Sequence, residues 1–366
     1  MTTPVLFEPL TFLRGPAAEN RLILSPMTSD QALPDGSVTE DELRWLGMRA
    51  RGGFGFIMTS ACYVQPEGKG GQGQFGIWSD DHVAGYARLA AVIKAHTRMA
   101  ALQLHHAGYR SPRRCVPQPV GPSDDPESGA RGLSTAEVEQ LVADFVSGAR
   151  RAQQAGFDGV ELHGAHGYIL TQFLSPADNR RDDRYGGSLE NRARIVFEII
   201  DGVREACRPD FQLGLRLSAE RYGLRLPEMR ELAAEIMGQG KIDYLDLSLW
   251  DAGKEPADEA FQGRPLVSYF TDLPRHGVRL GVAGKIMTPR VAARLIEAGA
   301  DFVMIGRAAI LHHDFPLRAR ADPAFQPVPL PVTAEYLANE GLGRRFLQYM
   351  ATWDGFVAPP DALAQG

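Results

Sequence analysis

The sequence predicts a single (β/α)₈ barrel, the TIM-barrel fold, over residues 1–366. Eight short runs of aliphatic and β-branched residues recur along the chain, and a helical pattern follows each run. Several runs are almost continuously apolar, as expected when helices cover one face of a parallel sheet and side chains fill the other. The composition shows no break along the eight units, so one closed barrel is favoured over two domains. The expected strands cover residues 21–27, 54–59, 98–104, 159–163, 212–217, 244–248, 279–282 and 302–305.

Capping residues indicate where two of the helices begin and end. Ser134 and Glu137 form a capping-box pattern, in which a hydroxyl and a carboxylate satisfy backbone amides at a helix start. The helix that begins there is expected to run to about residue 155 and to stop at Gly156. Gly299 is expected to stop a second helix, over residues 289–298, directly before the last strand.

Composition and charge argue against several classes of partner. A net charge of −6 gives no basic surface for nucleic acid or for a membrane, and no apolar run reaches the ~18 residues of a membrane span. Residues 1–9 lack the pattern of an export signal. Three dispersed cysteines are too few for a disulfide framework. We therefore expect a cytoplasmic protein that binds neither nucleic acid nor membranes.

The longest stretch without periodicity, residues 105–133, follows the third expected strand and contains five prolines. It is expected to be a long loop between a strand and a helix. In a barrel, such loops lie at the carboxyl ends of the strands, where active sites are built. Polar residues at those ends are the first candidates for chemistry, and they are Ser25, Thr28, Gln103, His105, His163, His166, Arg216, Ser248, Lys285 and Arg307.

Two pairs of residues after the seventh and eighth strands suggest a phosphate site. Gly284 precedes Lys285, and Gly306 precedes Arg307. Glycine lets backbone amides approach a phosphate, a following helix N-terminus favours the anion, and the cation adds a counter-charge. The alternative is that the glycines only make tight turns while the cations form surface pairs. Two consecutive matches favour the phosphate site.

His163 and His166 straddle the end of the fourth strand, and three roles compete for them. A zinc site would need a third protein ligand, and no companion with motif spacing is present. A structural pair satisfied by backbone carbonyls is the second role. In the third, two imidazole N–H groups stabilise negative charge on a carbonyl or nitro oxygen. Tyr168 lies nearby and could act as a general acid, because a phenol stays protonated at neutral pH.

A run of mixed charge over residues 178–192 precedes a helix for which Ser188 is the expected N-cap. By itself this run is expected to be a solvated, salt-bridged loop that contributes little to stability.

Together these residues resemble the Old Yellow Enzyme family of NAD(P)H:flavin oxidoreductases. The resemblance covers nearly the whole chain, and the segment over residues 156–192 is very specific to the family. The motifs that carry it lie at residues 20–28, 103–108, 155–168, 172–176, 184–192 and 305–307. The resemblance implies tightly bound, non-covalent FMN with NADH or NADPH as hydride donor. The FMN contacts that it implies are Ser25, Pro26, Met27, Thr28, Ala61, Gln103, Arg216, Gly284, Lys285, Gly306 and Arg307.

The resemblance also implies an activity. His163 and His166 would bind the activating oxygen of a small-molecule substrate, and Tyr168 would protonate its α-carbon. The reaction implied is ping-pong reduction of the C=C bond of an α,β-unsaturated carbonyl or nitro compound. The alternative within the family is a dehydrogenase or demethylase that oxidises an amine or related donor.

The chain departs from the family pattern at two places near the expected substrate. Ser29 to Ala32 follow the first strand where a tyrosine is common, and Tyr109 replaces a usual arginine. Both changes leave the substrate range open. The C-terminal tail, about residues 325–366, is aromatic for a tail and is expected to pack on its own barrel or at a dimer interface. A homo-oligomer is therefore left open.

Overall fold

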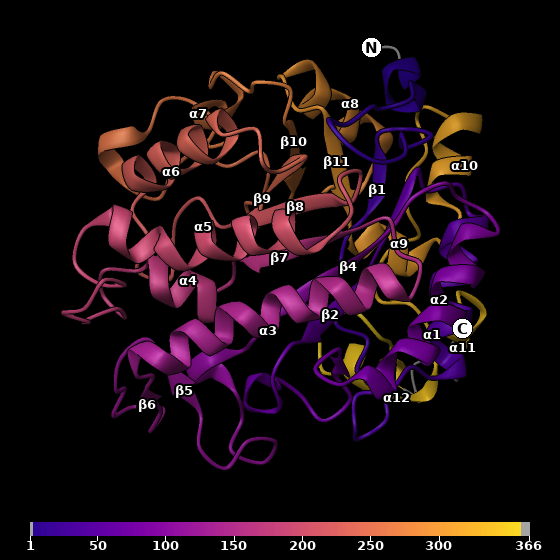
Figure 1. The fold of residues 1–366 in the computed structure, drawn as a ribbon. Coiled ribbons are helices and arrows are strands. Elements are labelled where there is room, and N and C mark those ends of the chain that lie inside the picture. The colour runs from indigo at the N-terminus through magenta and orange to yellow at the C-terminus, as the bar shows by residue number, and fades with distance from the viewer. Residues whose placement is uncertain (1–2, 360–366) are drawn as a thin grey trace.

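The computed structural model describes residues 3–359 and confirms the (β/α)₈ barrel (Figure 1). Eight parallel strands form a ring that closes because β1 pairs with β11 on one side and with β2 on the other. The short strand β3, Phe75–Gly76, adds to the outer end of β2. The barrel strands are β1 Leu22–Leu24, β2 Phe56–Tyr63, β4 Ala100–His105, β7 Gly159–Gly164, β8 Gln212–Leu217, β9 Tyr244–Ser248, β10 Arg279–Ala283 and β11 Phe302–Ile305.

Helices connect consecutive strands and cover the outside of the barrel (Figure 1). No helix within residues 3–359 is long and apolar enough to cross a membrane. The α-helices are α1 Glu40–Arg51, α2 Val83–Lys94, α3 Thr135–Gln154, α4 Ile169–Leu174, α5 Leu189–Ala206, α6 Leu226–Gly238, α7 Ser268–Thr271, α8 Pro289–Glu297, α9 Arg307–Leu311, α10 Phe315–Ala321, α11 Ala334–Asn339 and α12 Arg344–Met350. Short 3-10 helices lie at Thr3–Phe7, Pro66–Gly68, Asp80–His82, Gly108–Arg110 and Glu259–Phe261.

The capping predictions are confirmed. Ser134 caps α3 in a complete capping box with Glu137, and Ser188 caps α5 by accepting from the backbone N–H of Asn191. Gly156 and Gly299 follow α3 and α8 with φ of +90° and +105°. Only glycine adopts this left-handed conformation at little cost, so both helices stop where the sequence predicts.

Two strand ends differ from prediction by more than two residues. β1 ends at Leu24, since Pro26 has no N–H with which to continue the ladder. β2 continues to Tyr63, four residues beyond its expected end, and its register against β4 shifts between Met58 and Ala61. Such a bulge inserts extra chain into a strand and re-aims the side chains that follow. Ala61 thereby belongs to the strand end that faces the cavity.

The buried apolar residues form two separate layers. The larger layer lies between the strands and the surrounding helices, and the smaller fills the inside of the barrel. Inside the barrel, Tyr244 and Phe302 pack edge to face with ring centroids 5.8 Å apart. Space for these rings depends on glycine, because a Cβ at Gly214 or Gly281 would lie 2.1–2.2 Å from ring atoms of Tyr244 or Phe302.

The loop after β4 is more ordered than its sequence suggests. It contains a two-stranded parallel pair, β5 Val120–Gly121 and β6 Arg131–Gly132. The charged run over residues 178–192 fastens this loop, because Arg181 donates to the carbonyls of Pro122 and Leu133. Arg192 is buried and donates to the carbonyl of Leu174 and to Glu228. The interpretation of this run as a solvated loop is therefore wrong for Arg181 and Arg192, which make long-range contacts away from solvent, whereas Arg180 and Arg184 are exposed as predicted.

The described part of the C-terminal segment lies against α1 of its own chain (Figure 1). The ring centroids of Phe346 and Trp45 are 4.8 Å apart, and Arg49 donates to the carbonyl of Glu340 at 2.7 Å. The backbone N–H of Gly343 donates to Oε1 of Gln31 at 2.8 Å. Residues 360–366 of the predicted tail lie outside the described residues.

Gly281→Ala is expected to lower the free energy of unfolding by roughly 1–3 kcal/mol, because the new Cβ would clash with the rigid ring of Phe302. Urea unfolding measures this loss. Gly238→Ala is the matched control: Gly238 ends α6 with no heavy atom within 4 Å of an added Cβ, so its change should stay within about 0.5 kcal/mol. Equal stability of the two variants would contradict the proposed packing inside the barrel.

Candidate active site

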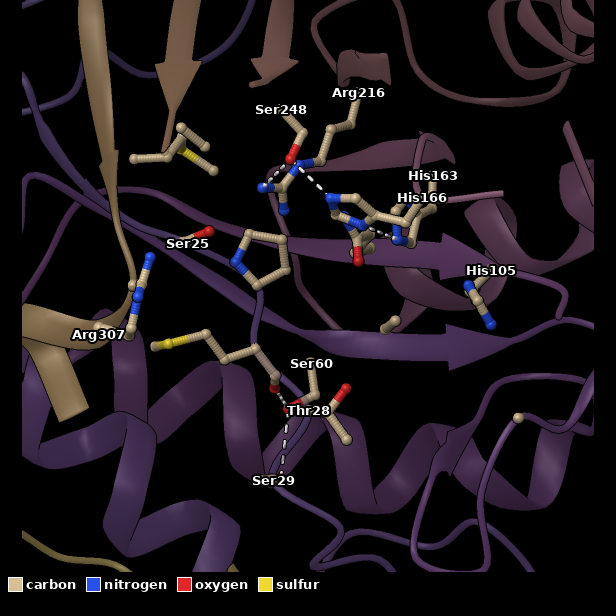
Figure 2. A pocket seen from close by; sticks show the side chains of 18 of the residues that line it. Ser25, Thr28, Ser29, Ser60, His105, His163, His166, Arg216, Ser248 and Arg307 are labelled. Atoms are coloured by element: carbon tan, nitrogen blue, oxygen red, sulfur yellow. Dashed lines mark hydrogen bonds between the residues drawn. The ribbon is translucent and has the colours of Figure 1, made fainter. Parts of the chain in front are cut away.

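A cavity of about 450 Å³ opens at the carboxyl ends of the barrel strands (Figure 2). Its volume lies in the range of cofactor and small-molecule sites. The structure brings every predicted site residue to this one cavity. They are Ser25, Pro26, Met27, Thr28, Ala61, Gln103, His163, His166, Tyr168, Arg216, Gly284, Lys285, Gly306 and Arg307.

One end of the cavity is formed by the loops after β10 and β11. A Cβ at Gly284 would lie 2.8 Å from the backbone nitrogen of Ala252, so only glycine lets the loop after β10 approach the loop after β9. Lys285 forms an ion pair with Asp251 at 3.1 Å. Arg307 makes no ion pair within residues 3–359 and points into the cavity near Ser25 (Figure 2). A free guanidinium beside two small-residue turns suits a phosphate group.

The wall contributed by β4, β7, β8 and β9 contains two buried carboxyl groups that the sequence analysis missed. Nε2 of Gln103 donates to Glu161 at 2.7 Å, and Nε of Arg216 lies 3.0 Å from Asp246. Burial and the neighbouring Asp246 raise the pKa of Glu161 to about 8. At neutral pH Glu161 therefore keeps its proton. The Asp246 carboxylate offsets the positive charge of Arg216.

The alternation of side chains along each strand could have identified these carboxyl groups from the sequence. In a strand, alternate side chains face the same side, so Glu161 must face the same way as His163, and Asp246 the same way as Ser248. Their pairing with Gln103 and Arg216 depends on the register between strands, which only the fold provides.

A third buried carboxyl group, Glu42 of α1, lies behind the loop after β1. It accepts hydrogen bonds from Ser29 and Gln31, both at 2.8 Å, and its Oε1 lies 3.0 Å from Oγ of Ser60. The single proton of the Ser60 hydroxyl serves either Glu42 or the carbonyl of Met27, which lies 2.7 Å from the same oxygen. Burial raises the pKa of Glu42 above its ordinary value, although the hydrogen bonds from Gln31, Ser29 and Ser60 oppose the rise.

The two histidines face each other across the turn after β7 (Figure 2). His166 has φ of +64°, a conformation that non-glycine residues adopt rarely, and its backbone N–H donates to Ser218. Nδ1 of His166 lies 3.3 Å from Nε2 of His163, and Nε2 of His166 lies 2.6 Å from Oγ of Ser248. Burial is the main cause that lowers the pKa of both imidazoles well below the ordinary value, so both are neutral.

One assignment of protons satisfies this chain of contacts. Arg216 donates to Ser248 at 3.2 Å, Ser248 donates to His166, and His166 donates to His163. The remaining proton of His163 then lies on Nδ1, which is buried and has no partner among the described residues. The chain thus presents a fixed N–H donor without an imidazolium charge. Groups of three or more His, Cys, Asp or Glu suited to a metal ion do not occur between residues 3 and 359.

Tyr168 stands beside this pair. Its ring centroid lies 5.2 Å from that of His163 and 4.3 Å from that of His105. Burial raises the pKa of the Tyr168 phenol, while the cation of Arg110 opposes this rise. The phenol is therefore protonated at neutral pH.

The rest of the cavity wall comes from segments that the sequence analysis did not assign to the site. Arg110 belongs to the loop after β4, and Tyr222 and Trp250 follow β8 and β9. Tyr349, Met350 and Trp353 reach the cavity from the C-terminal segment of the same chain. The aromatic composition of that segment was a signal, but only the fold places it at the cavity.

The donor set fits FMN. Arg307 and the two glycine turns suit its phosphate, and the segment over residues 25–28 lines the same cavity as Gln103 and Arg216. His163, whose buried Nδ1 has no hydrogen-bond partner among the described residues, lines the cavity as well. Fold and cavity together define the class of a barrel flavoenzyme.

The chain matches the model of the NADH:flavin oxidoreductase / NADH oxidase family over residues 5–324. It is 36% identical over 327 residues to the "Probable NADH-dependent flavin oxidoreductase YqiG" of Bacillus subtilis (strain 168), covering 86% of this chain and 87% of that protein. Morphinone reductase in complex with tetrahydroNAD is similar in structure, with a TM-score of 0.76, 30% identity and coverage of 91% and 94%. An Old Yellow Enzyme homologue from Zymomonas mobilis has a TM-score of 0.78, 26% identity and coverage of 94% and 99%.

The chain therefore belongs to the NADH:flavin oxidoreductase / NADH oxidase family, the Old Yellow Enzyme family. It is an FMN-dependent oxidoreductase that uses NADH or NADPH, as the sequence predicts.

Glu42→Gln should flatten the dependence of stability on pH. The pKa of Glu42 is higher in the folded protein than its ordinary value of 4.5, so the wild-type free energy of unfolding contains a contribution that falls as pH rises from there. This fall ends once pH exceeds the folded pKa. Glutamine carries a permanent N–H donor, so the variant should lack this contribution and still retain FMN.

Urea unfolding of the holoprotein between pH 5 and about 9 checks the result. Glu40→Gln removes an exposed carboxylate from the same helix and should leave the decline in place. A decline of the same size in Glu42→Gln and wild type would show that Glu42 is not the proton holder.

Proposed function

We propose that the chain reduces the activated C=C bond of α,β-unsaturated carbonyl or nitro compounds in a ping-pong reaction. The observation that carries the proposal is the pairing of a fixed imidazole donor with a protonated phenol at one cavity. His163 and His166 are neutral and hydrogen-bonded to each other, and Tyr168 lies beside them. This pair would stabilise an oxygen that gains negative charge and would donate a proton to a carbon.

The residues at the other end and along the wall would hold FMN. Gly284, Lys285, Gly306 and Arg307 would hold its phosphate, and the residues that would line its ring are Ser25, Pro26, Met27, Thr28, Ala61, Gln103 and Arg216. When bound, FMN accepts hydride from NADH or NADPH and supplies it to the substrate. The Asp246 carboxylate would limit the positive charge that Arg216 presents to the ring.

The histidines would bind the substrate's activating oxygen. Nδ1 of His163 carries a proton and has no partner in the described chain, so its N–H is free to donate. His166 would join it once its proton moves to Nε2, which then donates to the substrate oxygen in place of the contact with Ser248. Because neither imidazole is charged, each stabilises developing negative charge without losing a proton to the substrate. Before substrate binds, the Ser248 and Arg216 contacts fix the His166 tautomer that leaves the proton of His163 on Nδ1.

Tyr168 would supply the proton to the α-carbon. Burial holds its phenol protonated at neutral pH, so the proton is available for transfer. The protein thus binds, polarises and protonates the substrate within one cavity.

Anaerobic stopped-flow absorbance tests the proposal. The FMN-loaded protein is first reduced by NADH or NADPH and is then mixed with an enone, a nitroalkene, a maleimide or an amine-derived acceptor. Reoxidation by the alkenes with formation of the saturated product supports the proposal. Reduction of the oxidised protein by amine donors, with no reoxidation by any alkene, would replace it with an oxidative function.

Tyr168→Phe should leave reduction of the flavin by the nicotinamide nearly unchanged, since that half-reaction needs no protonation of a carbon. Reoxidation by a weakly activated enone should slow by about 10²–10⁴-fold, the usual contribution of a general acid. The two half-reactions are measured separately by stopped flow. An equal loss in both would contradict the role of Tyr168 as the acid.

A further inference from the structure

The cationic residues that line the cavity fall into two kinds. Arg216 is paired with Asp246 at 3.0 Å, and Lys285 is paired with Asp251 at 3.1 Å. Arg110 and Arg307 also line the cavity, but neither forms an ion pair within the described residues. The proposed FMN phosphate accounts for Arg307. Arg110 remains, beside Tyr168 at the substrate end, with no anion assigned to it.

Arg110 is held so that its donors stay free. Its guanidinium carbon lies 5.2 Å from the ring centroid of Tyr168 and 5.9 Å from that of Tyr222. One nitrogen, Nη1, donates to the carbonyl of His166. Contact through an aromatic face leaves the in-plane N–H groups of a guanidinium open, and these groups match the two oxygens of a carboxylate. The only carboxylate among the lining residues, Asp30, accepts from the backbone of Gly73 instead.

A second unpaired cation lies at the same rim. The guanidinium carbon of Arg221 lies 4.8 Å from the ring centroid of Trp250, whose Nε1 donates to the hydroxyl of Tyr222 at 3.2 Å. Arg221, Tyr222 and Trp250 have φ of +72°, +52° and +64°. Non-glycine residues adopt this conformation only where surrounding contacts hold it, so the rim is a built feature.

The charge of the rim contrasts with that of the whole chain. The protein has a net charge of −6, yet the guanidinium of Arg110 lines the substrate end without a carboxylate partner within residues 3–359, and Arg221 lies next to the lining residue Trp250. Clefts lined by one sign of charge attract ligands of the opposite sign and raise their local concentration. A neutral enone would leave this charge unused.

We infer that the substrate of this site carries a carboxylate, which binds Arg110 while His163 and His166 hold the activating oxygen. The inference rests on the proposed function and names the substrate class within it: unsaturated carbonyl or nitro compounds with a carboxylate remote from the reacting bond. The same anion chemistry is available from the pyrophosphate of the nicotinamide dinucleotide, so the test separates the two half-reactions.

The test compares wild type, Arg110→Met and the matched control Arg114→Met, all loaded with FMN. Arg114 is an exposed arginine four positions further along the same loop and does not line the cavity. Two pairs of probes differ only in charge: 4-carboxycinnamaldehyde with its methyl ester for turnover, and 4-hydroxybenzoate with its methyl ester for binding. Flavin absorbance reports the binding of the second pair to the oxidised enzyme.

The acid of each pair should bind wild type and Arg114→Met roughly 10- to 100-fold more tightly than its ester, the effect of one charge-assisted bidentate bond. In Arg110→Met the preference for acid over ester should disappear because the acid binds more weakly. The variant's binding of both esters and its reduction by NADH and NADPH should stay within about twofold of wild type.

Three results would overturn the inference. If Arg110→Met weakened the binding of acid and ester equally, the role of Arg110 would be to hold His166 in place. A loss confined to reduction by the nicotinamide would assign the anion to the dinucleotide. Equal affinity of wild type for acid and ester would show that Arg110 binds no carboxylate, whereas failure of wild type to reduce any alkene would remove the proposed function itself.

Discussion

Closure of the barrel is the constraint on which the rest of the structure depends. β1 pairs with both β11 and β2, so strands that are almost 280 residues apart in sequence become neighbours. Since all eight strands run parallel, their carboxyl ends meet at one rim. Residues as distant as Ser25 and Arg307 therefore line one cavity, and the inside of the barrel below them is filled by rings such as Tyr244 and Phe302. The filled interior gives the site a rigid base.

The buried ionisable groups at this rim are either held in their neutral form or paired with an opposite charge. Asp246 offsets Arg216, Glu161 holds a proton, and burial behind the loop after β1 raises the pKa of Glu42. The histidines stay neutral for the same reason, because removal from water disfavours the charged form of any group. The result is a site whose donors are strong through their fixed orientation, with little net charge of their own.

The outer part of the cavity follows a different design. Its walls come from loops and from the C-terminal segment, whose α12 packs on α1 and brings Tyr349 and Trp353 to the opening. Within residues 3–359, Arg110 and Arg221 form no ion pair and rest on aromatic faces. The proposed FMN contacts thus lie mainly at strand ends, whereas the connections supply the residues proposed to select the substrate.

The sequence by itself determined the features that depend on neighbouring residues. Hydrophobic periodicity located all eight barrel strands, and the capping box at Ser134 and the glycine after α3 set the ends of that helix. Only the tertiary structure decided what depends on distant partners. It buried Arg192, paired Glu42 with the loop after β1, and carried the C-terminal segment to its own cavity. The reason is physical: a cap or a period is a contact within a few residues, whereas burial and hydrogen-bond partners are set by segments that meet only when the barrel closes.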